Sequence, residues 1–233
     1  MAYKIGIDDG HGYETAGKRT PNGYHENYFN EKVKKYLITE LKRNGFSYVD
    51  CSPMTSDNSL QDRCNRANNA KVNIFVSIHA NAYGTGWNDA EGVETYHYPN
   101  SGNGQRLASL VQNELLKGTP QKNRGVKTAN FYVLKHTNMP AILVEAAFMT
   151  NKKEAELLKT KKFQEETAKD ICRGICKYYN KSYKSDEIYS NMPYTKWGYN
   201  EGLTTLTTYN KDDKFTVEQI FHILKRFKDK YIK

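Results

Sequence analysis

The sequence predicts an α/β fold of three layers, in which helices cover both faces of a mostly parallel sheet. Short apolar runs rich in β-branched residues alternate with longer segments of helical spacing through the first three-quarters of the chain. The runs at residues 72–78 and 141–144 are almost wholly apolar, which is typical of strands buried on both faces. A chain of 233 residues is long enough for one such domain and a small appendage.

The predicted strands are short apolar runs bounded by polar residues, glycine or proline. Most of their residues are aliphatic or aromatic, types that pack well on a pleated surface. Pro140 forms a turn between the last two runs. In chain order, the expected strands are residues 3–7, 46–49, 72–78, 131–134 and 141–144.

The predicted helices carry apolar residues at spacings of three and four, as expected for helices with one buried face. Asn27, Ser59 and Asn151 are candidate N-caps, and Gly45 is a residue type that commonly ends a helix. The expected helices are residues 28–44, about 59–70, 105–117, a short segment after Asn151, and 161–179.

The composition changes after Tyr179. Residues 181–190 are polar and are expected to link a domain of residues 1–180 to a small helical C-terminal module of residues 191–233. In the module, Thr216 begins a capping-box pattern that is followed by an apolar stripe. Two short helices are marginally stable alone, so they should pack on the larger domain, on a second copy of the chain or on a ligand.

The net charge of +9 favours anionic partners by long-range attraction. The positive charge is spread along the chain and no nucleic-acid motif stands out, so no nucleic-acid partner is expected. The alternative that these lysines merely solvate the surface stays open. No apolar stretch approaches the roughly 20 residues of a membrane span, and no signal peptide is visible, so we expect synthesis in the cytoplasm without membrane insertion.

Four cysteines occur, at positions 51, 64, 172 and 176. Cys172 and Cys176 lie four residues apart on a predicted helix and therefore on one face of it. Such a pair can bind a metal or form a disulfide, but Ile171 and Ile175 beside it indicate a buried stripe. We therefore expect reduced thiols in the core.

Four dispersed residues form the candidate site. His11 lies between two glycines after a predicted strand, His79 directly follows the central strand, and Glu145 follows a third apolar run. Because sites in open α/β sheets form beyond the carboxyl ends of strands, these three should meet at one edge. Two histidines and a carboxylate such as Glu26 are the protein ligands of a catalytic zinc ion, and a further carboxylate can serve as a general base.

The chain resembles the zinc-dependent N-acetylmuramoyl-L-alanine amidases found among bacterial autolysins and phage endolysins. The resemblance covers about residues 3–178, and its one departure is Tyr13, where a second glycine often follows. The markers are Asp9-Gly10-His11-Gly12, Glu26-Asn27, Leu60-Gln61-Asp62-Arg63-Cys64-Asn65-Arg66-Ala67-Asn68, Ser77-Ile78-His79-Ala80-Asn81-Ala82, Gly92-Val93-Glu94-Thr95-Tyr96, Asn130-Phe131-Tyr132-Val133-Leu134 and Met139-Pro140-Ala141-Ile142-Leu143-Val144-Glu145.

This resemblance implies a peptidoglycan hydrolase that cleaves the amide between N-acetylmuramic acid and the first L-alanine of the stem peptide. It implies Zn²⁺ held by His11, Glu26 and His79, with Glu145 as the catalytic base, and it leaves His25 exposed. A first-turn glutamate such as Glu26 could otherwise merely complement the helix dipole. Further candidates for substrate or wall binding are Asn81, His136, Trp197 and Tyr199.

The same resemblance suggests a phage endolysin acting at the bacterial wall, with anionic wall polymers as further partners. The C-terminal module is then expected to bind the wall, or otherwise to be a structural or dimerising tail. One alternative is a non-catalytic wall-binding protein that kept the fold. Such a protein would have lost a metal ligand or Glu145, and this chain keeps all of them. The other alternative is a zinc peptidase of the wall. Such peptidases commonly carry His-Glu-x-x-His, which this chain lacks.

Overall fold

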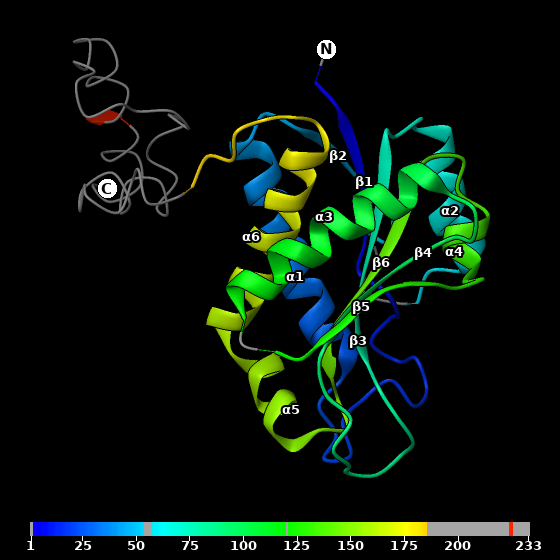
Figure 1. Ribbon diagram of the computed structural model, residues 1–233, viewed down its shortest axis with the longest axis vertical. Helices are drawn as coiled ribbons and strands as arrows, with labels where there is room; N and C mark the ends of the chain where they lie inside the picture. Colours follow the sequence, from blue (N-terminus) through cyan, green and yellow to red (C-terminus); the bar gives the residue numbers. More distant parts are fainter. Residues whose placement is uncertain (1, 54–56, 120, 186–223, 226–233) are drawn as a thin grey trace. The chain divides into compact units, whose positions relative to one another are not determined.

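The computed structural model describes residues 2–53, 57–119, 121–185 and 224–225. The chain divides into two compact units, Met1–Tyr183 and Lys184–Lys233. The first unit contains all of the sheet and the helices that cover it (Figure 1). Most of the predicted C-terminal module, including Trp197 and Tyr199, and half of the predicted linker lie outside the described residues.

Six strands form one sheet in the order β2-β1-β3-β6-β4-β5. All neighbouring strands run parallel except β4 and β6, which are antiparallel. The prediction of a mostly parallel sheet is therefore confirmed. The strands are β1 (Lys4–Asp8), β2 (Ser47–Asp50), β3 (Ile74–Asn81), β4 (Val93–His97), β5 (Asn123–Thr128) and β6 (Ala141–Phe148).

Helices lie on both faces of this sheet, as predicted (Figure 1). Helix α6 packs against both α1 and α3, and these three helices cover one face, whereas α2 and α4 contact each other on the opposite face. Their bounds are α1 (Glu26–Arg43), α2 (Leu60–Asn69), α3 (Gly102–Gly118), α4 (Tyr132–Lys135), α5 (Lys152–Lys159) and α6 (Lys161–Tyr178). None of the helices in the described part of the chain is long and apolar enough to cross a membrane.

Two apolar clusters hold the layers together. The larger joins the sheet to α1, α3 and α6, and includes Ile7, Leu37 and Ile171. The smaller lies on the α2 and α4 side, around Phe75 and Leu143. All four cysteines are free and buried, two in each cluster, in agreement with the prediction of core thiols.

Two predicted N-caps are confirmed. The Ser59 hydroxyl accepts the backbone N–H of Asp62 at the start of α2, and the Asn151 side chain accepts those of Lys153 and Glu154 at the start of α5. Gly45 follows α1 with φ +71°, the left-handed conformation that glycine adopts without strain.

The predicted N-cap of α1 is wrong. The helix begins at Glu26 rather than Tyr28, and the Asn27 side chain instead donates to the carbonyl oxygen of His11 at 2.8 Å. The backbone N–H of Glu26 donates to the carbonyl oxygen of Lys18 at 2.9 Å, so a tertiary contact satisfies a helix-terminal donor. His25 precedes the helix, and it is half-buried rather than exposed, because its ring stacks on Tyr13.

Residues 131–134 were expected to form a strand, and this prediction is also wrong. Phe131 directly precedes α4 and the other three residues belong to it, a single helical turn whose Val133 and Leu134 are buried in the smaller apolar cluster. The sheet instead gains β4 and β5, which the pattern of apolar runs did not reveal. The half-exposed β5 consists largely of polar residues, so its sequence lacks the apolar run by which a buried strand is recognised.

Candidate metal centre and cleft

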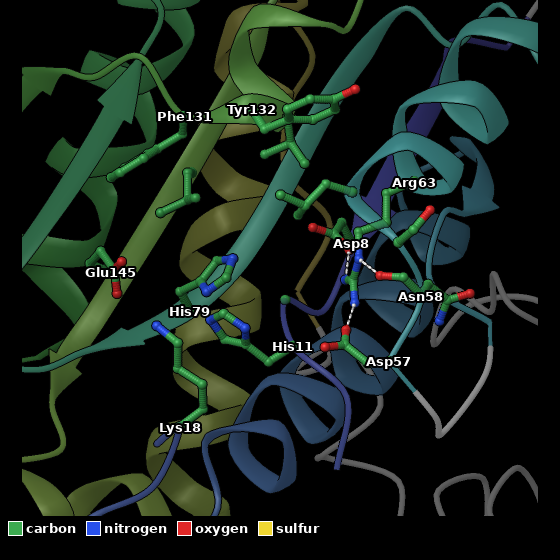
Figure 2. A pocket seen from close by; sticks show the side chains of 15 residues that line it. Asp8, His11, Lys18, Asp57, Asn58, Arg63, His79, Phe131, Tyr132 and Glu145 are labelled. Atoms are coloured by element: carbon green, nitrogen blue, oxygen red, sulfur yellow. Dashed lines mark hydrogen bonds and ion pairs between the residues drawn. The ribbon is translucent and has the colours of Figure 1, made fainter. Parts of the chain in front are cut away.

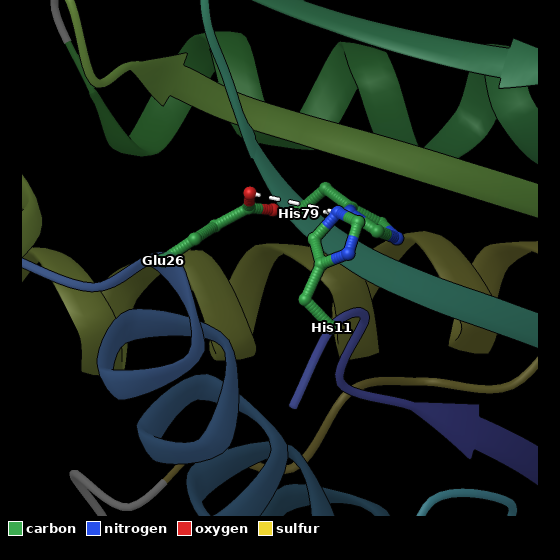
Figure 3. A group of neighbouring side chains, drawn as sticks. All are labelled: His11, Glu26 and His79. Atoms are coloured by element: carbon green, nitrogen blue, oxygen red, sulfur yellow. Dashed lines mark hydrogen bonds and ion pairs between the residues drawn. The ribbon is translucent and has the colours of Figure 1, made fainter. Parts of the chain in front are cut away.

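Three predicted ligands meet at one end of the sheet (Figure 3). His11, Glu26 and His79 each offer an atom within 4.8 Å of the others. The Glu26 carboxylate faces both rings, with Oε1 3.0 Å from Nδ1 of His79 and Oε2 3.6 Å from Nε2 of His11. The two imidazole rings meet edge to face, with centroids 4.9 Å apart. This set of two nitrogens and one carboxylate could hold a metal ion.

His11 reaches this point from the loop that follows β1. Gly10, immediately before it, has φ +53°. A Cβ atom at Gly10 would lie 2.5 Å from the His79 ring, closer than any real side chain tolerates. A glycine is therefore required here both for the backbone conformation and for the close approach of the two ligand segments.

Glu26 is the first residue of α1 and is almost completely buried. Its Oε1 accepts the backbone N–H of Ala80 at 3.1 Å and the side-chain amide of Asn30 at 3.2 Å. These donors come from the central strand and from the next turn of the same helix. They leave little rotational freedom to the carboxylate and hold it toward the two histidines.

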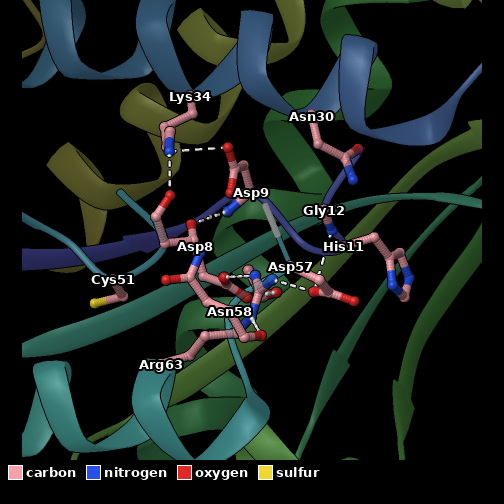
Figure 4. A network of polar contacts seen from close by, with 12 residues as sticks. Asp8, Asp9, His11, Gly12, Asn30, Lys34, Cys51, Asp57, Asn58 and Arg63 are labelled. Carbon is pink, nitrogen blue, oxygen red and sulfur yellow. Dashed lines mark hydrogen bonds and ion pairs between the residues drawn. The ribbon is translucent and has the colours of Figure 1, made fainter. Parts of the chain in front are cut away.

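A buried polar chain orients the His79 ring from the other side (Figure 4 shows its Arg63–Asp8 part). Nε2 of His79 lies 3.0 Å from the Ser77 hydroxyl, which donates to Asp8 at 2.6 Å. Asp8 is paired with Arg63, whose guanidinium also contacts Asp57 at 3.0 Å. Partners of this kind fix the orientation of a metal-binding histidine.

Electrostatics favours a cation at this point. Burial lowers the pKa of His11 to about 4, so its imidazole is neutral and free to ligate. Burial would raise the pKa of Glu26, but its contacts with His79 outweigh burial and lower it. Burial likewise opposes charge on His79, yet the bond to Glu26 raises its pKa. A metal ion here would replace the proton that His79 and Glu26 share.

Glu145 lies beside this cluster on β6, where it is the register partner of His79 on β3. Both residues lie inside their strands rather than beyond the ends, because β3 and β6 continue for two or more residues after the apolar runs stop. Oε2 of Glu145 is buried and has no hydrogen-bond partner among the described residues. Burial raises the pKa of Glu145 to about 8. Such a carboxylate is suited to exchange protons near neutral pH.

A cavity of about 620 Å³ opens onto these residues (Figure 2). His11, His79 and Glu145 line one end of it, and Leu60, Phe131, Tyr132, Val133 and Leu143 provide apolar lining. An open cleft with an apolar wall and a few polar groups is typical of a binding site for an extended ligand.

Other predicted residues lie outside this cavity lining. Asn81 ends β3 and donates to Glu94 at 2.7 Å, and His136 stacks on the Tyr132 ring at the end of α4. Their roles in substrate binding stay predictions. His97 is not in the metal cluster and is buried, with Nδ1 2.9 Å from the carbonyl oxygen of Tyr98.

Sequence reasoning missed two parts of the site. Ser77 and Arg63 lie within the motifs and Asp8 directly precedes one, but the contacts of Asp8 with the other two depend on the pairing of β1 with β3 and on the position of α2. Lys18 also lines the cavity, and nothing in its local sequence indicates this.

Comparisons with known proteins agree with this architecture. Residues 5–177 match the family described as N-acetylmuramoyl-L-alanine amidase. The chain is 38% identical over 177 residues to the N-acetylmuramoyl-L-alanine amidase LytC of Bacillus subtilis, a match that covers 75% of this chain and 35% of that protein. It thus spans about a third of the length of that relative. It is 33% identical over 195 residues to the endolysin of Bacillus phage SPP1, covering 79% of this chain and 69% of that protein.

Two solved structures show the same fold. An N-acetylmuramoyl-L-alanine amidase from Clostridium difficile 630 superimposes with a TM-score of 0.72 and 34% identity, covering 77% of this chain and 97% of that chain. The catalytic domain of CwlV from Bacillus (Paenibacillus) polymyxa var. colistinus gives a TM-score of 0.70 and 30% identity, covering 77% and 99%. The chain therefore belongs to the N-acetylmuramoyl-L-alanine amidase family.

Proposed function

We propose that this protein hydrolyses the amide between N-acetylmuramic acid and the L-alanine of the stem peptide in peptidoglycan. The observation that carries the proposal is the convergence of His11, Glu26 and His79, with Glu145 beside them, at one end of an open cleft. Family membership supports the substrate class. The geometry supports hydrolysis, because it joins a candidate metal centre to a carboxylate with a free oxygen.

We infer that the metal is zinc and that His11, Glu26 and His79 hold it. Two histidines and one carboxylate are a common ligand set for catalytic zinc, which leaves a position open for water or substrate. When bound, zinc would supply Lewis acidity, which lowers the pKa of water and polarises a carbonyl. The chain contributes the fixed ligand geometry through Asn30, Ala80 and Ser77.

Glu145 is the proposed general base. Its Oε2 takes a proton from the attacking water as the water oxygen bonds to the scissile carbonyl carbon. The same oxygen then gives that proton to the alanine nitrogen as the carbon–nitrogen bond breaks. The raised pKa of Glu145 suits both steps, because the group must gain and lose a proton in one turnover.

We further propose that the protein acts at the bacterial cell wall, as an endolysin or an autolysin. The similarity to a phage endolysin supports this assignment. The net charge of +9 would favour anionic wall polymers. Residues 191–233 remain a candidate wall-binding module, with a structural or dimerising tail as the alternative.

Metal dependence tests the proposal. A chelator should abolish the clearing of purified peptidoglycan, and addition of zinc should restore it. The metal content of the active protein, measured by atomic spectroscopy, should approach one zinc per chain. Full activity of a preparation verified to be metal-free would overturn the assignment of the site.

A further inference from the structure

Two cationic side chains, Arg63 and Lys18, line the cavity, and only Arg63 is paired with carboxylates of the described residues. Arg63 is 2% exposed and is paired with both Asp8 and Asp57. Its charge is therefore satisfied within the protein. Among the residues that the structure describes, Lys18 forms no salt bridge. Its ammonium group is thus the uncompensated positive charge of the described cavity wall.

The backbone of Lys18 is held in place by the segment that carries a metal ligand. Its carbonyl oxygen accepts the backbone N–H of Glu26 at 2.9 Å, and the next residue, Arg19, forms a β-bridge with His25. Residues 18–26 therefore form a closed loop that begins at Lys18 and ends at Glu26. This arrangement couples the position of the lysine to that of the proposed metal centre.

The side chain of Lys18 extends from this loop toward His79 and Glu145 (Figure 2). Lys18 lines the same cavity as His11, His79 and Glu145. Its ammonium group is therefore a cation in the wall around the proposed reaction site.

The negative charge that this lysine would meet during hydrolysis is an oxyanion. A substrate carboxylate bound at this end of the cavity would share it with the side chain of Glu145, and the ionised form of Glu145 would repel it. The scissile amide is neutral when it binds, and its carbonyl oxygen becomes negative only as water adds. A cation at this position therefore stabilises the transition state more than the bound substrate.

We propose that Lys18 is a catalytic residue whose ammonium group donates a hydrogen bond to the carbonyl oxygen of the scissile amide as that oxygen becomes an oxyanion. The inference rests on the proposed amidase function. As the water oxygen bonds to the carbonyl carbon, the π electron pair moves to the carbonyl oxygen, and Lys18 keeps its proton. The pair returns when the carbon–nitrogen bond breaks and Glu145 protonates the nitrogen.

The test compares Lys18→Met, Lys18→Arg and Arg19→Gln in the full-length, zinc-loaded protein acting on a soluble muramyl peptide. Lys18→Met preserves length without charge and should lower kcat by about 10²–10³-fold with KM changed less than about threefold. Lys18→Arg should recover part of the loss. Arg19→Gln removes a neighbouring exposed charge outside the cavity lining and should behave as wild type.

A binding measurement provides a readout independent of turnover. A phosphinate analogue of the tetrahedral intermediate should bind Lys18→Met more weakly by a factor similar to the loss in kcat, while the alanyl peptide product binds both proteins equally. Zinc content should not change. An unchanged kcat, a rise in KM alone, equal affinity for the analogue, or loss of zinc would each overturn the role of Lys18. Absence of amide cleavage by the wild type would instead overturn the proposed function, and this inference with it.

Discussion

Glu145 differs from Glu26 although the two carboxylates share one site. Glu26 is held by donors from Ala80, Asn30 and His79, whereas one oxygen of Glu145 is buried without a partner among the described residues. The first environment stabilises a fixed anion, as a ligand requires. The second raises the pKa, as a proton carrier requires. The distinction between ligand and base is thus visible in their surroundings.

Replacement of Glu145 by Gln tests this distinction. The variant should lose turnover by more than the roughly 10²–10⁴-fold attributed to proton transfer alone, if Glu145 also orients the attacking water. It should retain zinc, measured by metal analysis after gel filtration. The exposed Glu156 provides a matched control, because Glu156→Gln removes a carboxylate that is not part of the cavity lining. Loss of zinc from the Glu145 variant would show that this residue is a ligand.

Asp170, on α6, leads to a prediction about how the stability of the protein depends on pH. Its side chain is fully buried, and burial raises its pKa from 3.8 to about 7 despite the 2.6 Å contact with Arg173. Between these values, the folded state holds a proton that the unfolded state has lost. This group therefore makes stability fall as pH rises from about 4 to 7, by up to about 1.4 kcal/mol per pH unit.

Asp170→Asn should remove that contribution. The free energy of unfolding of the variant, relative to wild type, should rise between pH 5 and pH 8, because asparagine never ionises. Arg173 keeps a second partner in Glu166 at 2.6 Å, so its charge remains paired. Denaturant unfolding at several pH values measures the difference. A difference that is constant with pH would show that Asp170 has an ordinary pKa.

Helices α3 and α6 approach each other closely at Gly174. A Cβ atom there would lie 2.6 Å from the Cα of Val111. Alanine favours a helix over glycine by up to about 1 kcal/mol, but the contact with a backbone atom cannot be relieved by rotating a side chain. Overpacking of this kind costs about 1–3 kcal/mol, so the contact should outweigh the propensity.

Gly174→Ala is therefore expected to destabilise the protein, as measured by a lower midpoint of denaturant unfolding. Gly102→Ala is the matched control, because a Cβ atom at that helix start meets nothing within 4 Å. If Gly174→Ala were as stable as this control, the two helices would have to lie farther apart than described here.

The elements also show what could be predicted from sequence. Helices with an apolar stripe and a side-chain cap, such as α2 and α5, were predicted correctly because both signals are local. The start of α1 depends on a hydrogen bond from Glu26 to Lys18, a contact across a loop that no local pattern records. The single turn of α4 is too short for its periodicity to distinguish a helix from a strand.

In the site, too, the features set by local sequence were predicted and those set by tertiary contacts were not. His11, Glu26, His79 and Glu145 were predicted because each lies in a recognisable motif, and all but Glu26 lie near the end of an apolar run. The structure brings them together. The supporting contacts of Ser77 and Arg63, and the approach of Lys18, depend on which strands and loops become neighbours. Such tertiary contacts cannot be predicted from the sequence of one segment.

At the scale of the whole molecule, the first compact unit ends at Tyr183, slightly beyond the predicted boundary at residue 180. Lys181 donates to the carbonyl oxygen of Asn44 at 2.9 Å, and the Tyr183 hydroxyl donates to Glu40 at 2.6 Å. The Tyr183 ring also lies under the guanidinium of Arg173, at 5.1 Å. A truncation after residue 185 therefore retains contacts that a truncation after residue 180 would remove.

A chain of residues 1–185 should fold and cleave soluble muramyl peptides at nearly the full-length rate. It should clear intact walls more slowly, because tethering by a wall-binding module raises the local enzyme concentration without changing the chemistry. Residues 186–233 fused to a reporter should sediment with walls of a susceptible host. Equal clearing by both chains, together with no binding by the fusion, would leave the C-terminal residues a structural or oligomerising role.

Identification of the bond that is cut tests the central claim most directly. Peptidoglycan digested with the zinc-loaded protein should show new free amino groups on L-alanine and muramic acid residues freed of their peptides, as measured by amino-terminal labelling and mass spectrometry. The Glu145→Gln variant should produce neither. New reducing sugar ends, or new termini within the stem peptide while the alanine remains joined to muramic acid, would contradict the assignment of this cleft as an N-acetylmuramoyl-L-alanine amidase site.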